Sequence, residues 1–242
     1  VFSSVNLELT PGDVVVISGP TGSGKTTLLE TIVGITKLKT GRVSAGDISV
    51  FGLKPEVDVY QLGGLVGYLP QQPRSWFVSD RVSAELAEPS LAWAKFGVEE
   101  VDLLSEGQAV KLGISNALSH DPKLVVLDEP FAALDFESAQ ELNVLIGQWS
   151  KEGKIVVIAE HQLHLITHNA AKLLTLSGTL SKGEYLPSAS QPPRSLPIAP
   201  NQLITTKSIP QIRDLKLPEA ISIHQSERIA LLGSNGVGKT SL

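Results

Sequence analysis

The sequence predicts an α/β protein built around a mostly parallel β-sheet, and three short apolar runs carry most of that prediction. The runs are VVVI at 14–17, LVVL at 124–127 and IVVIA at 155–159, each about as long as one buried strand. Segments of helical character lie beside them along the chain. Strands that alternate with helices favour a parallel sheet covered by helices.

The elements can be justified in chain order from their composition and their end residues. Residues 5–9 alternate between apolar and polar side chains, and Pro11-Gly12 predicts a turn before the first apolar run. Asp121-Pro122 ends a helix that starts near Ala109. The predicted strands are 5–9, 13–18, two short ones within 41–52, 124–129 and 154–161, and the predicted helices are 26–35, 109–120 and 137–153.

The composition excludes several classes of protein. The 242 residues carry a formal charge of −5, so a broad basic surface for nucleic acid is not expected. The chain has no cysteine, hence no disulfide and no cysteine-based metal site. The apolar runs are much shorter than the roughly 20 residues of a membrane-spanning helix.

Two Gly-rich loops repeat one pattern near opposite ends of the chain. GPTGSGKT at 19–26 and GSNGVGKT at 233–240 both match G-x-x-x-x-G-K-[ST], and each follows an alternating stretch and an apolar stretch. A Pro/Ser-rich linker is predicted at 186–204. We therefore expect a first domain at 1–185 and the beginning of a second, similar domain at 205–242. The chain starts at Val1 and lacks methionine, so we expect it to be part of a longer protein.

Both Gly-rich loops are predicted to bind phosphate groups. Glycines let successive backbone N–H groups face the phosphates, and the helix that follows adds its positive N-terminal end. Lys25 would bridge the terminal phosphates, and the Thr26 hydroxyl would bind Mg²⁺. The alternative is a Gly-rich turn with a chance lysine, which the flanking strand and helix disfavour. The predicted nucleotide-binding residues are Gly19, Pro20, Thr21, Gly22, Ser23, Gly24, Lys25, Thr26 and Thr27, and in the second loop Gly233, Ser234, Asn235, Gly236, Val237, Gly238, Lys239, Thr240 and Ser241.

Two further segments carry polar residues at the ends of predicted elements. LVVLDEP at 124–130 ends a strand with Asp128, suited to Mg²⁺, and Glu129, suited to act as a general base toward water. Solvated acidic residues are the alternative there. LSEGQ at 104–108 places Ser105 at the start of a helix, where it could bind an anion or simply cap the helix.

In this order, the motifs resemble the ATP-binding-cassette (ABC) family. LSEGQ is similar to the family signature LSGGQ with Glu106 in place of the first glycine, and FAALD at 131–135 is similar to its D-loop. The resemblance implies a P-loop ATPase core with a mostly parallel sheet, an antiparallel β subdomain and a small helical subdomain. It implies ATP hydrolysis by Glu129, His161 and Gln71. It also implies ATP contacts from Ser105, Gly107, Gln108 and Asp135, and Mg²⁺ contacts from Thr26, Gln71, Asp128 and Thr240.

A narrower resemblance concerns QQPRSWFVSDRVSAEL at 71–86, which is similar to a segment of energy-coupling-factor (ECF) transporters. It implies a peripheral ATPase at the cytoplasmic face of the membrane that drives uptake of a vitamin or metal ion. Its implied partners are a substrate-binding membrane subunit, a second ABC domain of the same chain, and a transmembrane coupling protein. The coupling protein would dock near Gln71, Arg74, Trp76 and Phe77, with the Trp–Phe pair exposed between Arg74 and Arg81.

Two alternatives to a transporter remain at this stage. A soluble tandem ATPase could act on ribosomes or nucleic acid, although the nearly uncharged linker favours the transporter. A regulatory cassette could bind ATP without hydrolysing it, although Glu129 and His161 argue against that. Leu104 follows Gln71 closely, so either the helical subdomain is shortened or residues are missing between them, and we expect the Glu106 side chain to point outward.

Overall fold

The computed structural model describes residues 7–36, 48–86, 99–166, 171–176 and 180–182. The predicted linker at 186–204 and the predicted second domain at 205–242, with its phosphate loop, lie outside these ranges. So does most of the segment 41–52, where two short strands were predicted; within the described residues it contributes one bridge, between Val50 and Leu53.

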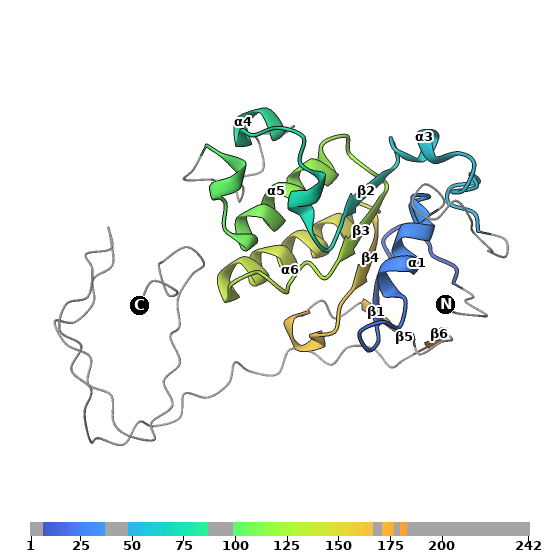
Figure 1. Ribbon diagram of the computed structural model, residues 1–242. Coiled ribbons are helices and arrows are strands. Elements are labelled where there is room, and N and C mark those ends of the chain that lie inside the picture. Colours follow the sequence, from blue (N-terminus) through green and yellow to red (C-terminus); the bar gives the residue numbers. More distant parts are fainter. Residues whose placement is uncertain (1–6, 37–47, 87–98, 167–170, 177–179, 183–242) are drawn as a thin grey trace, which may run out of the picture. The chain divides into compact units, whose positions relative to one another are not determined.

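The centre of the fold is a six-stranded sheet with the order β2-β3-β4-β1-β5-β6 (Figure 1). All neighbouring pairs are parallel except β5 and β6. The carboxyl ends of β1, β2, β3 and β4 therefore meet at one edge of the sheet. The strands are β1 (Val14–Ser18), β2 (Val66–Leu69), β3 (Leu124–Asp128), β4 (Ile155–Ala159), β5 (Ala171–Leu176) and β6 (Leu180–Lys182).

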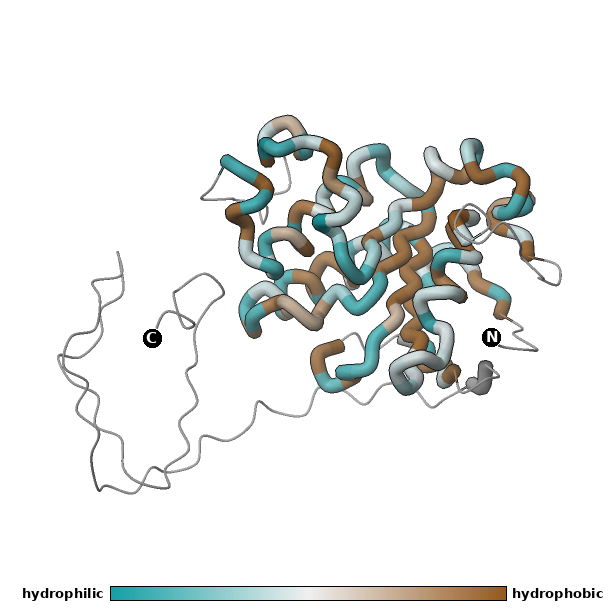
Figure 2. Tube along the Cα trace, viewed as in Figure 1, coloured by the Kyte–Doolittle hydropathy of each residue, from teal (hydrophilic) through white to brown (hydrophobic). Residues whose placement is uncertain are grey.

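Helices cover both faces of this sheet (Figure 1). α1 (Lys25–Ile32) packs on one face, and α5 (Glu106–Leu118) and α6 (Phe136–Lys151) pack on the other. Successive residues of β1 and β4 alternate between the two cores, as the strand repeat requires. Figure 2 shows the strands as a hydrophobic band between these helices. The short helices are α3 (Val59–Leu62), α4 (Val82–Glu85), η1 (Pro73–Trp76), η2 (Val101–Leu103) and η3 (Leu163–Leu165).

The predicted strands at the three apolar runs and the three predicted helices are confirmed within a few residues at their ends. The predicted strand before Pro11 is wrong for residues 7–9, which have no strand partner among the described residues. The chain there turns through a bond from the Thr10 N–H to Asp13 Oδ2. β2 and β5 were not predicted. β2 is only four residues long and is interrupted by a glycine, so it lacks the unbroken apolar run that marks the other strands.

Two glycines allow α5 to approach β2 closely. A side chain at Gly67 in β2 would collide with the backbone carbonyl of Ala117 in α5. A side chain at Gly113 in α5 would come within 2.6 Å of Leu69 in β2. The close contact fixes α5, which begins at the LSEGQ segment, against the strand that leads to Gln71.

Candidate functional site

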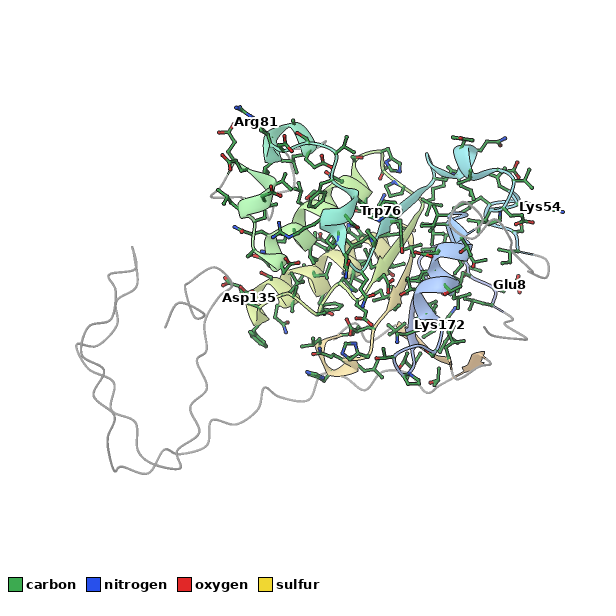
Figure 3. All side chains as sticks on the ribbon, viewed as in Figure 1. Glu8, Lys54, Trp76, Arg81, Asp135 and Lys172 are labelled. Carbon is green, nitrogen blue, oxygen red and sulfur yellow. The ribbon has the colours of Figure 1, made fainter. Side chains whose placement is uncertain are left out.

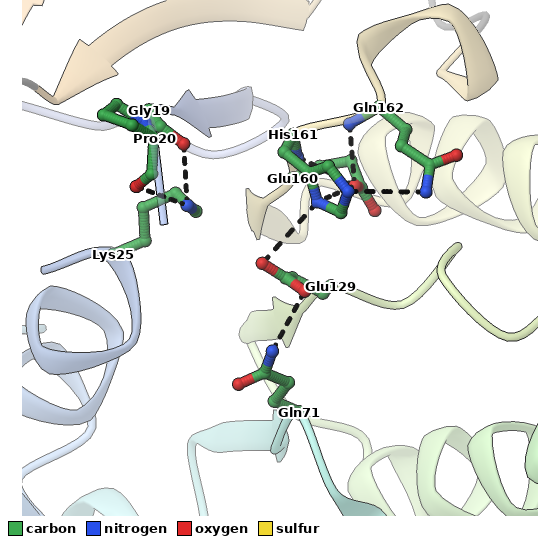
Figure 4. Close-up of polar contacts among 8 residues, drawn as sticks. All are labelled: Gly19, Pro20, Lys25, Gln71, Glu129, Glu160, His161 and Gln162. Atoms are coloured by element: carbon green, nitrogen blue, oxygen red, sulfur yellow. Dashed lines mark hydrogen bonds and ion pairs between the residues drawn. The ribbon is translucent and has the colours of Figure 1, made fainter. Parts of the chain in front are cut away.

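The first Gly-rich loop connects β1 to α1, as the sequence predicts. Gly22 and Gly24 have φ angles of 81° and 98°, which favour glycine. Lys25 is buried, and its ammonium donates hydrogen bonds to the carbonyls of Gly19 at 2.8 Å and Pro20 at 3.3 Å (Figure 4). The loop thus holds a positive charge where phosphates would bind. Thr21 is exposed, and Thr26 and Thr27 lie in the first turn of α1.

Asp128 ends β3 beside this loop, and its carboxylate is buried; within the described ranges neither of its oxygens accepts a hydrogen bond. Burial raises its pKa to about 6. The nearby Thr26 hydroxyl favours the ionised form, although its geometry falls short of a hydrogen bond. Unpaired buried carboxylate oxygens are costly and suit a cation. The Ser23 hydroxyl in the loop is also buried without a partner.

The residues present therefore fit Mg²⁺ at Asp128 and Thr26. No group of three or more His, Cys, Asp or Glu side chains in the described ranges is arranged to hold a metal ion by itself. Mg²⁺ does not require one, because it usually binds one or two protein groups together with phosphate oxygens and water.

Glu129, Gln71 and His161 come together at the carboxyl edge of the sheet (Figure 4). They follow β3, β2 and β4 respectively. Gln71 Nε2 donates to Glu129 Oε2 at 3.0 Å, and His161 Nδ1 lies 3.6 Å from Glu129 Oε1. The sequence positions of these residues are far apart, so their convergence results from the parallel sheet. The three predicted catalytic residues thus form one polar group.

The backbone of Glu129 has the left-handed conformation, with φ of 51°. This conformation is uncommon for a residue with a side chain, and such positions concentrate at functional sites. The Glu129 N–H donates to the Ala159 carbonyl at 2.9 Å, which ties the turn to the end of β4. The strained turn therefore sits where the predicted general base is required.

The LSEGQ segment starts α5 as a capping box. Ser105 Oγ accepts from the Gln108 N–H, and the Ser105 N–H donates to Gln108 Oε1 at 2.8 Å. Gly107 is buried in the first turn. No hydrogen bond in the described part of the chain joins Ser105 to Lys25. The helix-capping interpretation of this segment is therefore confirmed locally, and contact with a nucleotide stays a prediction.

Arg74 ties the segment after Gln71 to the LSEGQ segment. Its guanidinium donates to Glu106 Oε1 at 2.9 Å, to the Val101 carbonyl at 2.9 Å and to the Leu104 carbonyl. The Glu106 side chain is 70% exposed, as predicted for an outward orientation. Arg74 is thus engaged within this chain, and its predicted place beside the docking site stays a prediction.

The predicted exposed Trp–Phe pair is only half right. Trp76, labelled in Figure 3, is 44% exposed. Its ring stands edge-on to the Tyr68 ring at a centroid distance of 5.4 Å. Phe77 instead packs against the small apolar cluster of Val82, Val101, Leu104 and Leu112. Arg81 contacts Glu99 at 3.3 Å. The predicted exposure of Trp76 is confirmed. The predicted exposure of Phe77 is wrong, because its ring packs against this small apolar cluster.

Asp135 lies at the N-terminal end of α6 (Figure 3). Its Oδ1 accepts from the Ser138 N–H at 2.8 Å and caps the helix. Sequence reasoning missed Glu160, which is fully buried beside His161. The sequence did contain a signal for its burial, because Glu160 directly follows the unbroken apolar strand at 155–159.

Comparison with known proteins identifies the family. The ABC transporter family model matches residues 2–132. The taurine import ATP-binding protein TauB of Escherichia coli is 33% identical over 189 residues, which cover 73% of each chain. This chain therefore belongs to the ABC transporter family, and it is an ATP-binding subunit that hydrolyses ATP.

Solved structures agree with the predicted fold. The dimeric ATP-binding cassette MJ0796, in a post-hydrolysis state with ADP and phosphate, superimposes with a TM-score of 0.63 at 22% identity, over 77% of this chain and 91% of that one. The cassette cbiO1 of Clostridium perfringens, part of the ABC transporter complex cbiONQ, gives 0.59 at 24% identity, over 75% and 81%. The ABC ATPase core is thereby confirmed. None of the described helices is both long and apolar enough to cross a membrane.

Proposed function

We propose that this cassette hydrolyses ATP at the carboxyl edge of its sheet and that the energy drives uptake of a small nutrient, such as a vitamin or a metal ion. The observation that carries the catalytic part is the convergence of Gln71, Glu129 and His161 beside the phosphate loop. Three strand ends supply these residues, so small movements of the sheet edge would affect all of them together.

The phosphate loop would hold the nucleotide. Backbone N–H groups of residues 21–27 and the Lys25 ammonium would contact the phosphates. Thr26, Asp128 and Gln71 would hold Mg²⁺, which when bound supplies positive charge at the β- and γ-phosphate oxygens. The buried, unpaired carboxylate of Asp128 supports this assignment.

Glu129 would act as the general base for the attacking water. The water oxygen bonds to the γ-phosphorus, its proton passes to the Glu129 carboxylate, and the bond to the oxygen of ADP breaks to leave ADP and phosphate. The hydrogen bond from Gln71 orients the carboxylate. His161 would contact the γ-phosphate.

A second cassette would complete the sites. We propose that residues 1–185 form the first cassette and that residues 205–242 begin the second, joined by the linker at 186–204. Lys239 and Thr240 of the second phosphate loop would then face Ser105, Gly107 and Gln108 of the first signature segment. Lys25 would face a second signature segment. The repeated motif and the dimeric state of MJ0796 support this arrangement.

The transport role would require membrane partners of the ECF type, a transmembrane coupling protein and a substrate-binding subunit. The cassette would then lie peripherally at the cytoplasmic face of the membrane. The importer TauB and the membership of cbiO1 in the cbiONQ complex support this proposal. The sequence resemblance at 71–86 is what favours the ECF type. A soluble role on ribosomes or nucleic acid is the competing function.

Co-sedimentation of the full-length protein tests the transport role. We expect the wild type in the membrane fraction, and we expect Trp76→Ala to release it, because truncation of an aromatic anchor costs about 2 kcal/mol, or about thirtyfold in affinity. Tyr60→Ala removes another exposed aromatic ring, in α3, and should leave the protein bound. Sedimentation of the wild type with ribosomes would overturn the transport proposal, and retention of folded Trp76→Ala would overturn the docking site.

A further inference from the structure

Glu160 is a carboxylate that the fold buries completely although no catalytic role has been given to it. It follows β4 directly, and its N–H donates to the Ile17 carbonyl of β1 at 3.0 Å. Burying a carboxylate in a sheet is costly unless its oxygens are paired. The hydrogen bonds that the Glu160 carboxylate accepts therefore indicate what this buried residue does.

The Glu160 carboxylate is paired almost entirely with the two residues that follow it. Its Oε1 accepts from the His161 N–H at 2.8 Å and from the Gln162 N–H at 2.9 Å (Figure 4). Its Oε2 is buried and accepts no hydrogen bond in the described part of the chain. One oxygen thus fixes the backbone of the turn that carries His161.

The same oxygen also lies against the His161 ring. His161 Nδ1 is 3.3 Å from Glu160 Oε1 and 3.6 Å from Glu129 Oε1. The other ring nitrogen, Nε2, is 3.4 Å from the side-chain amide of Gln162. The His161 side chain is 49% exposed, so packing alone does not fix its orientation. A nitrogen that faces two carboxylates favours the form with a proton on that nitrogen.

We propose that Glu160 is the positioning residue for His161. It holds the ring with the Nδ1–H toward its own carboxylate, and this orientation leaves the other nitrogen, Nε2, to donate to the terminal phosphate when that nitrogen also carries a proton. Glu160 is the nearer of the two carboxylates to Nδ1, at 3.3 Å against 3.6 Å for Glu129, so Glu129 is not the main partner of the ring. This inference rests on the proposed role of His161 in ATP hydrolysis.

Glu85 provides a matched control, because it makes the same kind of backbone contact without a histidine. Its Oε2 accepts from the N–H groups of Val78 at 3.1 Å and Ser79 at 2.9 Å. If Glu160 were only a cap for its turn, Glu160→Gln and Glu85→Gln would have the same kind of effect. Each would alter thermal stability and leave the turnover number unchanged.

The test uses the full-length protein with a single, a double and a control variant. We expect Glu160→Gln to lower kcat about tenfold, as removal of a histidine's orienting partner does elsewhere. In the His161→Ala background, the same change should lower kcat no further, because Glu160 acts through His161. Glu85→Gln should leave kcat unchanged. A tenfold loss that persists without His161 would overturn the proposal.

A second readout is independent of activity. Nitrogen chemical shifts of the His161 ring, measured well above the ordinary histidine pKa of about 6.5, report which nitrogen carries the proton. We expect Nδ1–H in the wild type and a smaller Nδ1–H fraction in Glu160→Gln. An Nε2–H ring in the wild type would overturn the proposal. If the shifts agree but His161→Ala hydrolyses ATP normally, Glu160 orients the ring and the role proposed for His161 is the part that fails.

Discussion

At the scale of single residues, Asp128 shows that a site residue can lower the stability of the folded protein. Its carboxylate is buried, it lacks hydrogen bonds, and burial raises its pKa from 3.8 to about 6. The ionised form of such a buried group destabilises the folded protein relative to the unfolded chain. A bound cation would remove this cost, so the residue is better suited to binding than to stability.

The pKa of Asp128 predicts how stability depends on pH. The folded protein keeps this proton to a higher pH than the unfolded chain. The pH-dependent cost of Asp128 is therefore absent below about pH 4, grows as the pH rises to about 6, and levels off at about 3 kcal/mol above that. We expect Asp128→Asn, without nucleotide or Mg²⁺, to be the more stable protein at neutral pH. Urea unfolding across this pH range measures the difference.

Asp13 provides a control of opposite sign. Although burial opposes it, the bond from Lys172 at 2.6 Å lowers the pKa of Asp13. Its favourable contribution is therefore present above the unfolded pKa of 3.8 and lost as the pH falls through the lower, folded value. Asp13→Asn should destabilise at neutral pH. Stability curves for Asp128→Asn and the wild type that run parallel at all pH values would contradict the account of Asp128.

At the scale of elements, the contact between β2 and α5 joins the segment of Gln71 to the LSEGQ helix. Gly67→Ala would press a methyl group against the Ala117 carbonyl, and backbone cannot yield as a flexible side chain can. Overpacking of this kind costs about 1–3 kcal/mol. We expect a lower urea midpoint for Gly67→Ala. Gly64→Ala is the matched control, because nothing lies within 4 Å of a side chain there; equal midpoints for both variants would refute the close contact.

Arg74 and Glu106 form an asymmetric pair, and this predicts unequal effects. Glu106→Gln removes an exposed ion pair, which contributes about 0–1 kcal/mol. Arg74→Ala also leaves the Leu104 carbonyl without its donor, a loss that costs about 1–3 kcal/mol, and removes one of the two donors to the Val101 carbonyl, which keeps the Leu104 N–H. We expect Arg74→Ala to lower the free energy of unfolding clearly more than Glu106→Gln. The reverse order in a denaturant titration would show that the ion pair, and not the carbonyl contacts, holds the two segments together.

At the scale of the whole molecule, the sequence predicted those strands that consist of unbroken apolar residues. β1, β3 and β4 are unbroken apolar runs, and the motif order named Gln71, Glu129 and His161. β2 contains Gly67, and its place in the sheet depends on α5 across from it. The pairing of Arg74 with Glu106, the partial burial of Phe77 and the role proposed for Glu160 depend on contacts between distant segments. Spacing along the chain does not encode such contacts, so these features required the structure.

The central claim is that Glu129 is the general base of an ATPase site assembled from three strand ends. ATP turnover by full-length Glu129→Gln, compared with ATP binding by the same variant, tests it most directly. The amide keeps the shape and loses the base, so we expect binding to persist and turnover to fall about 10²–10⁴-fold. Glu141→Gln in α6, whose carboxylate contacts Lys111 at 3.2 Å, should turn over like the wild type. Wild-type turnover by Glu129→Gln would contradict the account.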